Sequence, residues 1–294
     1  MFEITEKKDL TDNIIWMKVK AEMVSRSCLP GQFVIVRTNE MSERIPLTIC
    51  DYDRNDGTIV IVFQTIGTGT SDMAALNAGD SFQDVVGPLG MPSDLCSEDP
   101  EKLEKLKQQK IIFIAGGVGT APVYPQLKWL KEHGVKADAI VGTKTKSTLI
   151  LEPEMKSVTD HLYIATDDGS YGKPGMVTGV LQELSDSGNH YDRCIAIGPM
   201  IMMKFVCSLT RTLKIPTTVS LNPIMVDGTG MCGACRVLVG GKVKFACVDG
   251  PEFDGHLVDF DTAMKRQQQY KTLEGRAILA RQEGDTHRGG CRQC

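Results

Sequence analysis

The sequence lacks an excess of positive charge, because its 33 Lys and Arg residues are outnumbered by 37 Asp and Glu residues. The resulting net charge of −4 argues against a protein that coats nucleic acid. The sequence also lacks any apolar run near the ~20 residues that a bilayer-spanning helix needs. Its first residues, MFEITEKKDLTDN, contain no apolar stretch typical of a signal peptide. We therefore expect a soluble, cytoplasmic protein whose partners are neither nucleic acid nor a membrane.

Neither disorder nor a disulfide framework fits the composition. Apolar residues make up 41% and charged residues 24%, values typical of a folded globular protein. Ten cysteines in a long chain without an export signal are expected to be reduced thiols or metal ligands. Five of them are solitary, whereas Cys232, Cys235 and Cys247 crowd into a short segment and Cys291 and Cys294 close the sequence.

The first third of the chain consists of short β-branched segments separated by turn residues. Regular segments with Gly and Pro between them predict an antiparallel barrel or sandwich. One helix is expected at 71–77, after the glycines of TIGTGT, and the charged stretch 96–110 is expected to be a linker or an exposed helix. The expected strands are 13–22, 32–38, 45–53, 57–65 and 80–90.

Beyond residue 110, continuous apolar strands alternate with amphipathic helices. This alternation predicts a parallel sheet covered on both faces, which is typical of dinucleotide-binding domains. After Asn222 the chain is rich in Gly and Cys until about Gly250, and a polar segment with one expected helix at 264–284 ends it. The expected strands are 110–117, 136–144, 161–169, 191–200 and 217–222, and the expected helices are 120–134, 176–186 and 202–213.

The predicted fold class is therefore β plus α/β. An antiparallel β-barrel is followed by a parallel-sheet nucleotide-binding domain and a small cysteine-rich module that would bind a metal cluster. The expected parts are the barrel at 1–95, a charged linker or insertion at 96–110, the α/β domain at 111–221, the cluster-binding module at 222–260, and a C-terminal helix and tail at 261–294.

A glycine-rich turn follows the first strand of the α/β domain. Gly116, Gly117 and Gly119 let the backbone approach a ligand phosphate, and Thr120 and Pro122 begin a helix whose free amides favour negative charge. The string is not the strict G-x-G-x-x-G fingerprint, which argues against a conventional Rossmann dehydrogenase. The alternative is a tight turn that needs glycines for its own geometry.

Two later strand ends also fall where open α/β sheets bind ligands, at TDDGSYG and at GPM. Carboxylates at the first end would accept hydrogen bonds from ribose hydroxyls and favour NADH, whereas Lys144 and Lys146 would attract a 2′-phosphate. The alternative reading of the Asp-Asp-Gly string is an ordinary turn. The candidate nucleotide-binding residues at these two ends are Asp167, Asp168, Gly198 and Met200.

The segment RIPLT, 44–48, lies in the predicted barrel. Arg44 can pair with a pyrophosphate, and the hydroxyl of Thr48 can meet a ring nitrogen. The start of the helix that follows offers further amides at Gly69, Thr70 and Ser71. The alternative is a surface arginine beside a hairpin turn.

The strongest pattern is DGTGMCGACRVLVGGKVKFAC, 227–247. Cys232 and Cys235 at C-x2-C, with Cys247 further on in a glycine-rich loop, are typical of an iron–sulfur cluster whose sulfides approach backbone amides. A [2Fe–2S] cluster needs four ligands, and Asp227 stands five residues before Cys232, where a plant-type pattern has its first cysteine. A carboxylate there would keep four anionic ligands while replacing one soft sulfur by a harder oxygen.

Other ligand sets remain open for this loop. A structural zinc site is the main alternative, although three cysteines with one aspartate are uncommon for zinc. Cys207 is a rival fourth ligand, but we expect it to be a core residue of a helix. Cys291 and Cys294 form a second C-x2-C pair, which we interpret as free thiols in a frayed tail.

In order, RIPLT in a barrel, GGVGTAP in an α/β domain and a terminal cysteine loop make residues 1–260 resemble the ferredoxin–NADP reductase superfamily. The resemblance is to its flavin and iron–sulfur branch. That branch includes electron-transfer subunits of dihydroorotate dehydrogenase, which carry four cysteines, and small subunits of NADH-dependent reduced ferredoxin:NADP oxidoreductases, also called sulfide dehydrogenase-like subunits. Asp227 resembles the first ligand of the second group. The stretch 96–110 and the terminal C-R-Q-C depart from the family pattern.

The resemblance implies that the barrel holds FAD, with Arg44 near the pyrophosphate, Pro46 and Leu47 beside the ring, and Thr48, the residue assigned to catalysis, near the flavin N5. It implies that the FAD phosphates contact Gly69, Thr70 and Ser71. It implies that NAD(H) lies along Gly116, Gly117, Gly119, Thr120, Pro122, Asp167, Asp168, Gly198 and Met200. It implies a [2Fe–2S] cluster on Asp227, Cys232, Cys235 and Cys247.

The implied activity is that of an NAD(P)H-linked flavin and iron–sulfur oxidoreductase subunit, which exchanges hydride between NAD(H) and FAD and passes single electrons through the cluster. The sequence has no second flavin domain, so the resemblance also implies a partner: a larger FAD and [4Fe–4S] subunit related to the glutamate synthase small chain, through which ferredoxin reacts in electron bifurcation. Two alternatives stay open. They are the electron-transfer subunit of an NAD-dependent dihydroorotate dehydrogenase and a zinc-stabilised nucleotide-binding regulator without redox activity.

Overall fold

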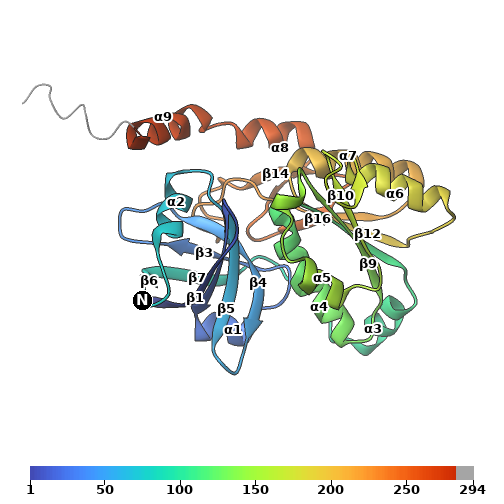
Figure 1. Ribbon diagram of the computed structural model, residues 1–294, viewed down its shortest axis with the longest axis horizontal. Helices are drawn as coiled ribbons and strands as arrows, with labels where there is room; N and C mark the ends of the chain where they lie inside the picture. The colour runs from blue at the N-terminus through green and yellow to red at the C-terminus, as the bar shows by residue number, and fades with distance from the viewer. Residues whose placement is uncertain (283–294) are drawn as a thin grey trace, which may run out of the picture.

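The computed structural model of the 294-residue chain describes residues 1–282. Two seven-stranded sheets lie side by side, and an arm of two helices extends from the second sheet over the first (Figure 1). A two-stranded hairpin completes the described strands. Within the described residues, no helix combines the length and the apolar character that a membrane crossing requires.

The first sheet is a near-closed antiparallel barrel with the strand order β6-β1-β2-β5-β4-β3-β7. Its core side chains come from alternate strand positions: Met17, Val19 and Ile61 pack inside the barrel, whereas Val60 and Val62 are buried on its outer side against the α/β domain. The elements of this part are β1 (Phe2–Thr11), β2 (Ile14–Lys20), α1 (Glu22–Ser27), β3 (Phe33–Arg37), β4 (Ile45–Asp53), β5 (Thr58–Gln64), α2 (Thr68–Ala75), β6 (Ser81–Phe82) and β7 (Asp84–Leu89).

Strand β1 and helix α1 are absent from the sequence expectations. The sequence of β1, FEITEKKDLT, is dominated by charged residues, and only Ile4 in it is fully buried. Such a strand carries almost no apolar alternation, and it forms because the backbone of β2 pairs with it along its length. The helix expected at 71–77 is α2, which begins three residues earlier.

The second sheet has the order β11-β10-β9-β8-β12-β13-β16 and is parallel up to β13. Its central strands are buried on both faces, in agreement with their continuous apolar sequences. The elements are β8 (Ile111–Gly116), α4 (Thr120–Glu132), β9 (Ala137–Thr143), α5 (Glu152–Val158), β10 (Leu162–Thr166), β11 (Lys173–Pro174), α6 (Val177–Asp186), β12 (Arg193–Ile197), α7 (Met200–Leu213) and β13 (Thr217–Ser220), with 3-10 turns η1 (Gly117–Gly119) and η2 (Lys146–Thr148).

The stretch between the two sheets contains helix α3 (Pro100–Lys107). Asp99 caps this helix by accepting hydrogen bonds from the backbone amides of Glu101 and Lys102. Leu106 and Cys96 are buried against the second sheet and the adjoining barrel strands, so this charged stretch contributes to the core as well as to the surface.

The cysteine-rich segment after β13 forms a hairpin and then returns to the second sheet. Its last strand pairs antiparallel with β13, which attaches the module to the edge of the α/β sheet. Buried Cys235, Cys247 and Val237 continue the core of the α/β domain. The elements are β14 (Arg236–Val239), β15 (Lys242–Phe245), β16 (Glu252–Asp254), α8 (Phe260–Gln267) and α9 (Lys271–Gln282).

The expected C-terminal helix is two helices. The break at Gln268–Tyr270 lets α9 turn over the barrel, where it contacts α2 (Figure 1). Arg281 of α9 pairs with Asp72 of α2 at 2.6 Å and donates to the carbonyl of Thr68 at 3.1 Å. Cys291 and Cys294, predicted to be free thiols, lie outside the described residues.

Candidate functional site

A cleft of about 1060 Å³ lies between the barrel and the carboxyl ends of the parallel strands. The barrel side comes from β4, β5 and the start of α2, and the opposite side comes from the turns after β8, β10 and β12. The segment that leads from β13 into the cysteine-rich module forms a third side, with Leu221, Asn222, Pro223 and Met225. The predicted site residues that line the cleft are Pro46, Leu47, Thr48, Thr70, Gly116, Gly117, Gly119, Pro122, Asp167 and Gly198.

The remaining predicted nucleotide and flavin residues are not among those that line the cleft. Thr120 is buried, and its hydroxyl donates to the carbonyl of Gly117 at 2.9 Å. Ser71 donates to the carbonyl of Gly67 at 2.9 Å, and Met200 is buried in the core. Gly69 lies against the carboxylate of Glu43, which occupies the place where a side chain at Gly69 would extend.

The glycines of the β8 turn serve two different purposes. A side chain at Gly116 would collide with Met202 and Pro199, and one at Gly119 would collide with the carbonyl of Ile197. These two glycines are therefore required by the close packing of β8 against β12. Gly117 is different, because its φ is +54° and a side chain there would meet nothing within 4 Å. Its open backbone faces the cleft, as an approaching phosphate requires.

The predicted charged residues behind the turns divide into two groups. Asp167 and Lys144 line the cleft. Asp168 instead folds onto Ser170, whose hydroxyl and backbone amide donate to it at 2.7 and 2.9 Å and lower its pKa. The ammonium of Lys146 lies 4.9 Å from the ring centre of Tyr171, which is a cation–π contact. Only one carboxylate and one ammonium of these four residues therefore face a ligand in the cleft.

Thr70 and Thr48 hold different positions at the barrel wall. The hydroxyl of Thr70 accepts hydrogen bonds from the backbone amides of Ile66 and Gly67 at 2.9 and 3.1 Å, and so it completes the start of α2. Thr48 is partly exposed on β4, directly beside Leu47, and its neighbour across the ladder is Phe33 of β3. The three residues Pro46, Leu47 and Thr48 thus present a continuous edge of β4 to the cleft.

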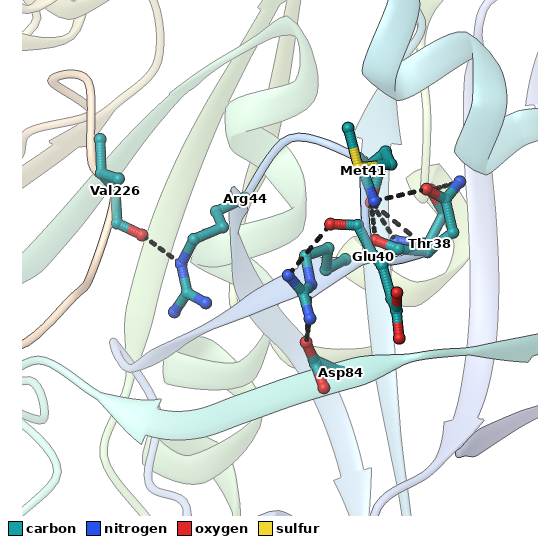
Figure 2. Close-up of polar contacts among 9 residues, drawn as sticks. Thr38, Glu40, Met41, Arg44, Asp84 and Val226 are labelled. Carbon is teal, nitrogen blue, oxygen red and sulfur yellow. Dashed lines mark hydrogen bonds and ion pairs between the residues drawn. The ribbon is translucent and has the colours of Figure 1, made fainter.

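Arg44 lies just before β4 and reaches across to the cysteine-rich module (Figure 2). Its Nε donates to the backbone carbonyl of Val226 at 2.6 Å, a contact between residues 182 positions apart in the sequence. Val226 is the residue before Asp227. The predicted pyrophosphate ligand and the predicted cluster loop are therefore joined directly.

The cysteine-rich loop brings part of the predicted ligand set together. The Sγ atoms of Cys235 and Cys247 lie 3.2 Å apart, and both side chains are buried, whereas Cys232 is exposed. The carboxylate of Asp227 accepts hydrogen bonds from the amides of Thr229 at 2.8 Å and Cys232 at 2.7 Å. Those amides, that of Thr229 first, lower the pKa of Asp227 and hold its side chain as an anion beside Cys232.

Within residues 1–282, no three His, Cys, Asp or Glu side chains already stand together as ligands of a metal ion. The donor set and the loop nevertheless suit a cluster. Gly228, Gly230 and Gly233 have positive φ values, which bend the backbone around the space between Asp227 and the thiols. Burial, followed by the adjacent Cys235 thiol, raises the pKa of Cys247 to about 12, so the Cys247 thiol requires a cationic centre to bind as a thiolate.

The structure adds site residues that sequence patterns did not indicate. Val226 acts through its contact with Arg44, which is far away in the sequence, and it belongs to no recognisable string. Asn222 and Met225 line the cleft, although they precede the cysteine pattern. The only signal that pointed to them is their position at the end of the predicted strand 217–222 and just beyond it, at the carboxyl edge of the sheet.

Comparison of the sequence with known families and relatives agrees with this arrangement. Residues 222–259 match the iron–sulfur cluster binding domain of dihydroorotate dehydrogenase B. A homologue of the electron-transfer subunit of dihydroorotate dehydrogenase B (NAD(+)) from Thermotoga maritima is 43% identical over 272 residues, 92% of each chain. An uncharacterized protein of Clostridium beijerinckii, from the adh 3′ region, is 58% identical over 99% of this chain and 98% of its own.

Solved structures show the same fold. The structure of an NADH-dependent reduced ferredoxin–NADP oxidoreductase, described for flavin-based electron bifurcation, is 41% identical, has a TM-score of 0.86 and covers 95% of this chain and 98% of its own. The cytochrome b5 reductase domain of Ulva prolifera nitrate reductase is 17% identical with a TM-score of 0.56, over 73% of this chain and 92% of its own, and so shares the fold alone.

The barrel, the α/β sheet and the matched module define a protein of the ferredoxin–NADP reductase fold with an iron–sulfur cluster binding module. The chain belongs to the family of electron-transfer subunits of dihydroorotate dehydrogenase B, a flavin and iron–sulfur oxidoreductase family that includes close relatives of the bifurcating oxidoreductase. The predicted fold class and the predicted family resemblance are thereby confirmed.

Proposed function

We propose that the chain is the FAD- and [2Fe–2S]-containing subunit of an NADH-dependent reduced ferredoxin:NADP oxidoreductase. One observation carries the proposal: a single cleft is bordered by the β4 edge of the barrel, the open turn at Gly117 and the segment that leads into the cysteine loop. A flavin, a nicotinamide nucleotide and a cluster would then be neighbours. The 41% identical solved relative, described as such an oxidoreductase, supports the finer assignment.

The barrel edge would hold the FAD. Pro46 and Leu47 would lie beside its ring, Thr48 near the N5, and Arg44 and the start of α2 at Gly69, Thr70 and Ser71 near its phosphates. The carboxylate of Glu43 beside Gly69 would have to move from that position. Bound there, FAD supplies hydride transfer with the nicotinamide, and no side chain of the cleft is needed as an acid or base.

The facing turns would hold NAD(H). Gly117, Gly119 and Pro122 would border its pyrophosphate, and Gly198 would border the nicotinamide end. Asp167 would accept hydrogen bonds from ribose hydroxyls and so favour NADH over NADPH. Thr120, Asp168 and Met200 would contribute by shaping these turns, because their side chains are engaged elsewhere.

Asp227, Cys232, Cys235 and Cys247 would hold the [2Fe–2S] cluster, which supplies one-electron transfer. The carboxylate at the first position supports the bifurcating subunit over the dihydroorotate branch, since the branch pattern has a cysteine there. The cluster-binding module would cover 222–260, following the barrel at 1–95, the charged segment at 96–110 and the α/β domain at 111–221, and preceding the C-terminal part at 261–294.

The electrons would pass to a larger subunit with its own FAD and [4Fe–4S] clusters, with which ferredoxin reacts. The second candidate function is the electron-transfer subunit of an NAD-dependent dihydroorotate dehydrogenase. It is favoured by relatives such as the Fusobacterium nucleatum subunit of that name, 30% identical over 85% of this chain and 94% of its own.

The test is purification of the chain with whatever subunit accompanies it, followed by flavin, iron, sulfide and zinc analysis. We expect one FAD and one [2Fe–2S] cluster per copy of this chain, and reduction of NAD+ by NADPH that depends on ferredoxin. Turnover without ferredoxin would contradict bifurcation while leaving the reductase function intact. Copurification of an orotate-forming chain would select the second candidate, and zinc without iron or flavin would contradict both.

A further inference from the structure

We infer that Arg44 is a positioning residue that couples occupation of the flavin pyrophosphate site to the conformation of the cluster loop. The inference rests on the proposed function, but it concerns a contact that the proposed function does not need. Its basis is the hydrogen bond from Nε of Arg44 to the carbonyl of Val226 (Figure 2).

The guanidinium of Arg44 keeps hydrogen-bond donors for a second partner. A guanidinium carries five N–H donors in a fixed planar fork, and only Nε is taken by Val226. The two Nη groups remain for a second acceptor, and Arg44 lies two residues before Pro46, the first β4 residue that lines the cleft. A pyrophosphate bound by the Nη groups would therefore orient the same rigid plane that holds the Val226 carbonyl.

The orientation of the Val226 carbonyl affects the backbone of the neighbouring Asp227. It shares one planar peptide unit with the amide of Asp227, so the orientation of that carbonyl sets the start of the Asp227 backbone. Asp227 in turn accepts hydrogen bonds from the amides of Thr229 and Cys232. A short series of contacts thus leads from the barrel to two predicted cluster ligands.

Two other contacts fasten the same loop to the barrel, and neither involves Arg44. Gly228 packs so closely against Leu89 and Ile35 that a side chain there would collide with both. At the far end of the loop, the amide of Met91 donates to the carbonyl of Gly250 at 2.6 Å. With its ends fastened in this way, the loop has little freedom, and a shift at Val226 is transmitted to Asp227.

A nearby arginine offers a matched control. Arg37 of β3 pairs with Asp84 at 2.7 Å, and it also donates to the carbonyl of Glu40, so its contacts stay inside the barrel. A substitution at Arg37 removes a guanidinium from the same region without touching the cluster loop.

The experiment compares the full chain, loaded with its cofactors, as wild type, Arg44→Lys, Arg44→Gln and Arg37→Gln. The readouts are FAD affinity, thermal unfolding, and the electron paramagnetic resonance spectrum of the reduced cluster before and after removal of FAD. In the wild type we expect the cluster spectrum to change when FAD is removed. We expect Arg44→Gln to weaken FAD binding at least tenfold and to abolish that dependence.

Arg44→Lys separates charge from coupling, because an ammonium is a point charge without the planar fork. We expect it to keep FAD affinity within a few-fold while losing the dependence of the cluster spectrum on FAD, with Arg37→Gln behaving as wild type. A cluster spectrum that responds to FAD equally in wild type and both Arg44 variants would overturn the inference. A wild-type chain that binds neither FAD nor a cluster would instead overturn the proposed function.

Discussion

Glu252 shows at the scale of one residue how three parts of the chain are joined. Its Oε1 accepts a hydrogen bond from Nε2 of Gln126 in α4 at 2.7 Å, and its Oε2 lies 2.9 Å from the hydroxyl of Ser93, in the segment after β7. The same hydroxyl lies 3.0 Å from Oε1 of Gln126. The barrel, the α/β domain and the strand that follows the cysteine loop meet at this ring of three side chains.

The hydrogen count of the ring favours a neutral carboxyl. Ser93 has a single hydroxyl hydrogen but lies near two acceptor oxygens, one on Gln126 and one on Glu252. If Glu252 is protonated, it donates to Ser93, Ser93 donates to Gln126, and Gln126 donates back to Glu252. Burial raises the pKa of Glu252 to about 7. The hydrogen bonds with Ser93 and Gln126 and the charge of Arg193 oppose this shift, and nearby Asp94 adds to it.

This ring predicts a pH dependence of stability. Between the ordinary carboxyl pKa of 4.5 and the folded value of about 7, the unfolded chain releases the proton while the folded chain keeps it. Rising pH across this window therefore lowers the free energy of unfolding, by up to about 3 kcal/mol. Glu252→Gln preserves a neutral ring at every pH, so urea unfolding should show a weaker pH dependence in that variant. Parallel curves for the two proteins between pH 5 and 7 would contradict the prediction.

Asp227 is the second residue whose role can be tested alone. Its carboxylate is proposed as a cluster ligand, but it also accepts the amides of Thr229 and Cys232. Asp227→Asn keeps an amide oxygen for these bonds and removes the anionic ligand, whereas Asp227→Cys restores an anionic ligand. We expect at least a tenfold loss of bound iron in the first variant, and an iron content near wild type with an altered spectrum in the second.

Asp249→Asn is the control for this pair, because it removes a carboxylate charge from the same module, where Asp249 accepts the amide of Phe245 at 2.7 Å. An unchanged cluster spectrum in Asp227→Asn would show that another residue completes the ligand set.

At the scale of elements, the turn from β8 to α4 separates packing from ligand approach. Gly119 has no room for a side chain because the carbonyl of Ile197 lies against it, and Gly117 has room but a left-handed φ of +54°. Gly119→Ala should lower the free energy of unfolding by about 2–3 kcal/mol through overpacking of β8 against β12. Gly117→Ala should cost about 1 kcal/mol of backbone strain.

For NADH affinity we expect the reverse order: Gly117→Ala should lose more affinity than Gly119→Ala. A methyl group at Gly117 extends into the cleft, so NADH affinity should fall more in Gly117→Ala than the loss of stability explains. Denaturant unfolding and NADH titration of both variants check this. Equal stability losses, or an unchanged NADH affinity in Gly117→Ala, would show that this turn is not the approach for the pyrophosphate.

At the scale of the whole molecule, the α8–α9 arm connects the end of the cysteine-rich module to the proposed flavin helix (Figure 1). Arg281 contacts both Asp72 and the carbonyl of Thr68 in α2. Both partners of the ion pair are about half exposed, with side-chain exposures of 48% each, so the pair contributes little to stability. Its effect is expected in the position of α2.

Truncation after Gln268 should therefore change the free energy of unfolding by about 1 kcal/mol or less and speed FAD release several-fold. Arg281→Ala should reproduce most of the faster release while keeping the helix. Stopped-flow release of FAD and thermal unfolding measure the two effects. If truncation speeds release and Arg281→Ala does not, the arm acts through another contact.

Periodicity and composition alone determined much of the architecture. The apolar strands β8, β9 and β12 and their amphipathic helices are predicted because each carries the pattern of its own burial. The strand β1 was missed because its charged sequence, in which only Ile4 is fully buried, has no such pattern. The helix in the 96–110 stretch agrees with one of the two expected alternatives, but the burial of Leu106 within it and of Cys96 before it was not expected.

The cysteine pattern at 227–247 and the RIPLT segment at 44–48 could also be recognised from the sequence, because their functional residues are close together along the chain. Only the tertiary structure decided which glycines face the cleft, that Asp168 turns away from it, that Arg44 holds Val226, and that Glu252 closes a ring with Ser93 and Gln126. The periodicity of a local sequence reflects the burial of one helix or strand. These contacts form between separate elements, so the packing of those elements determines which residues meet.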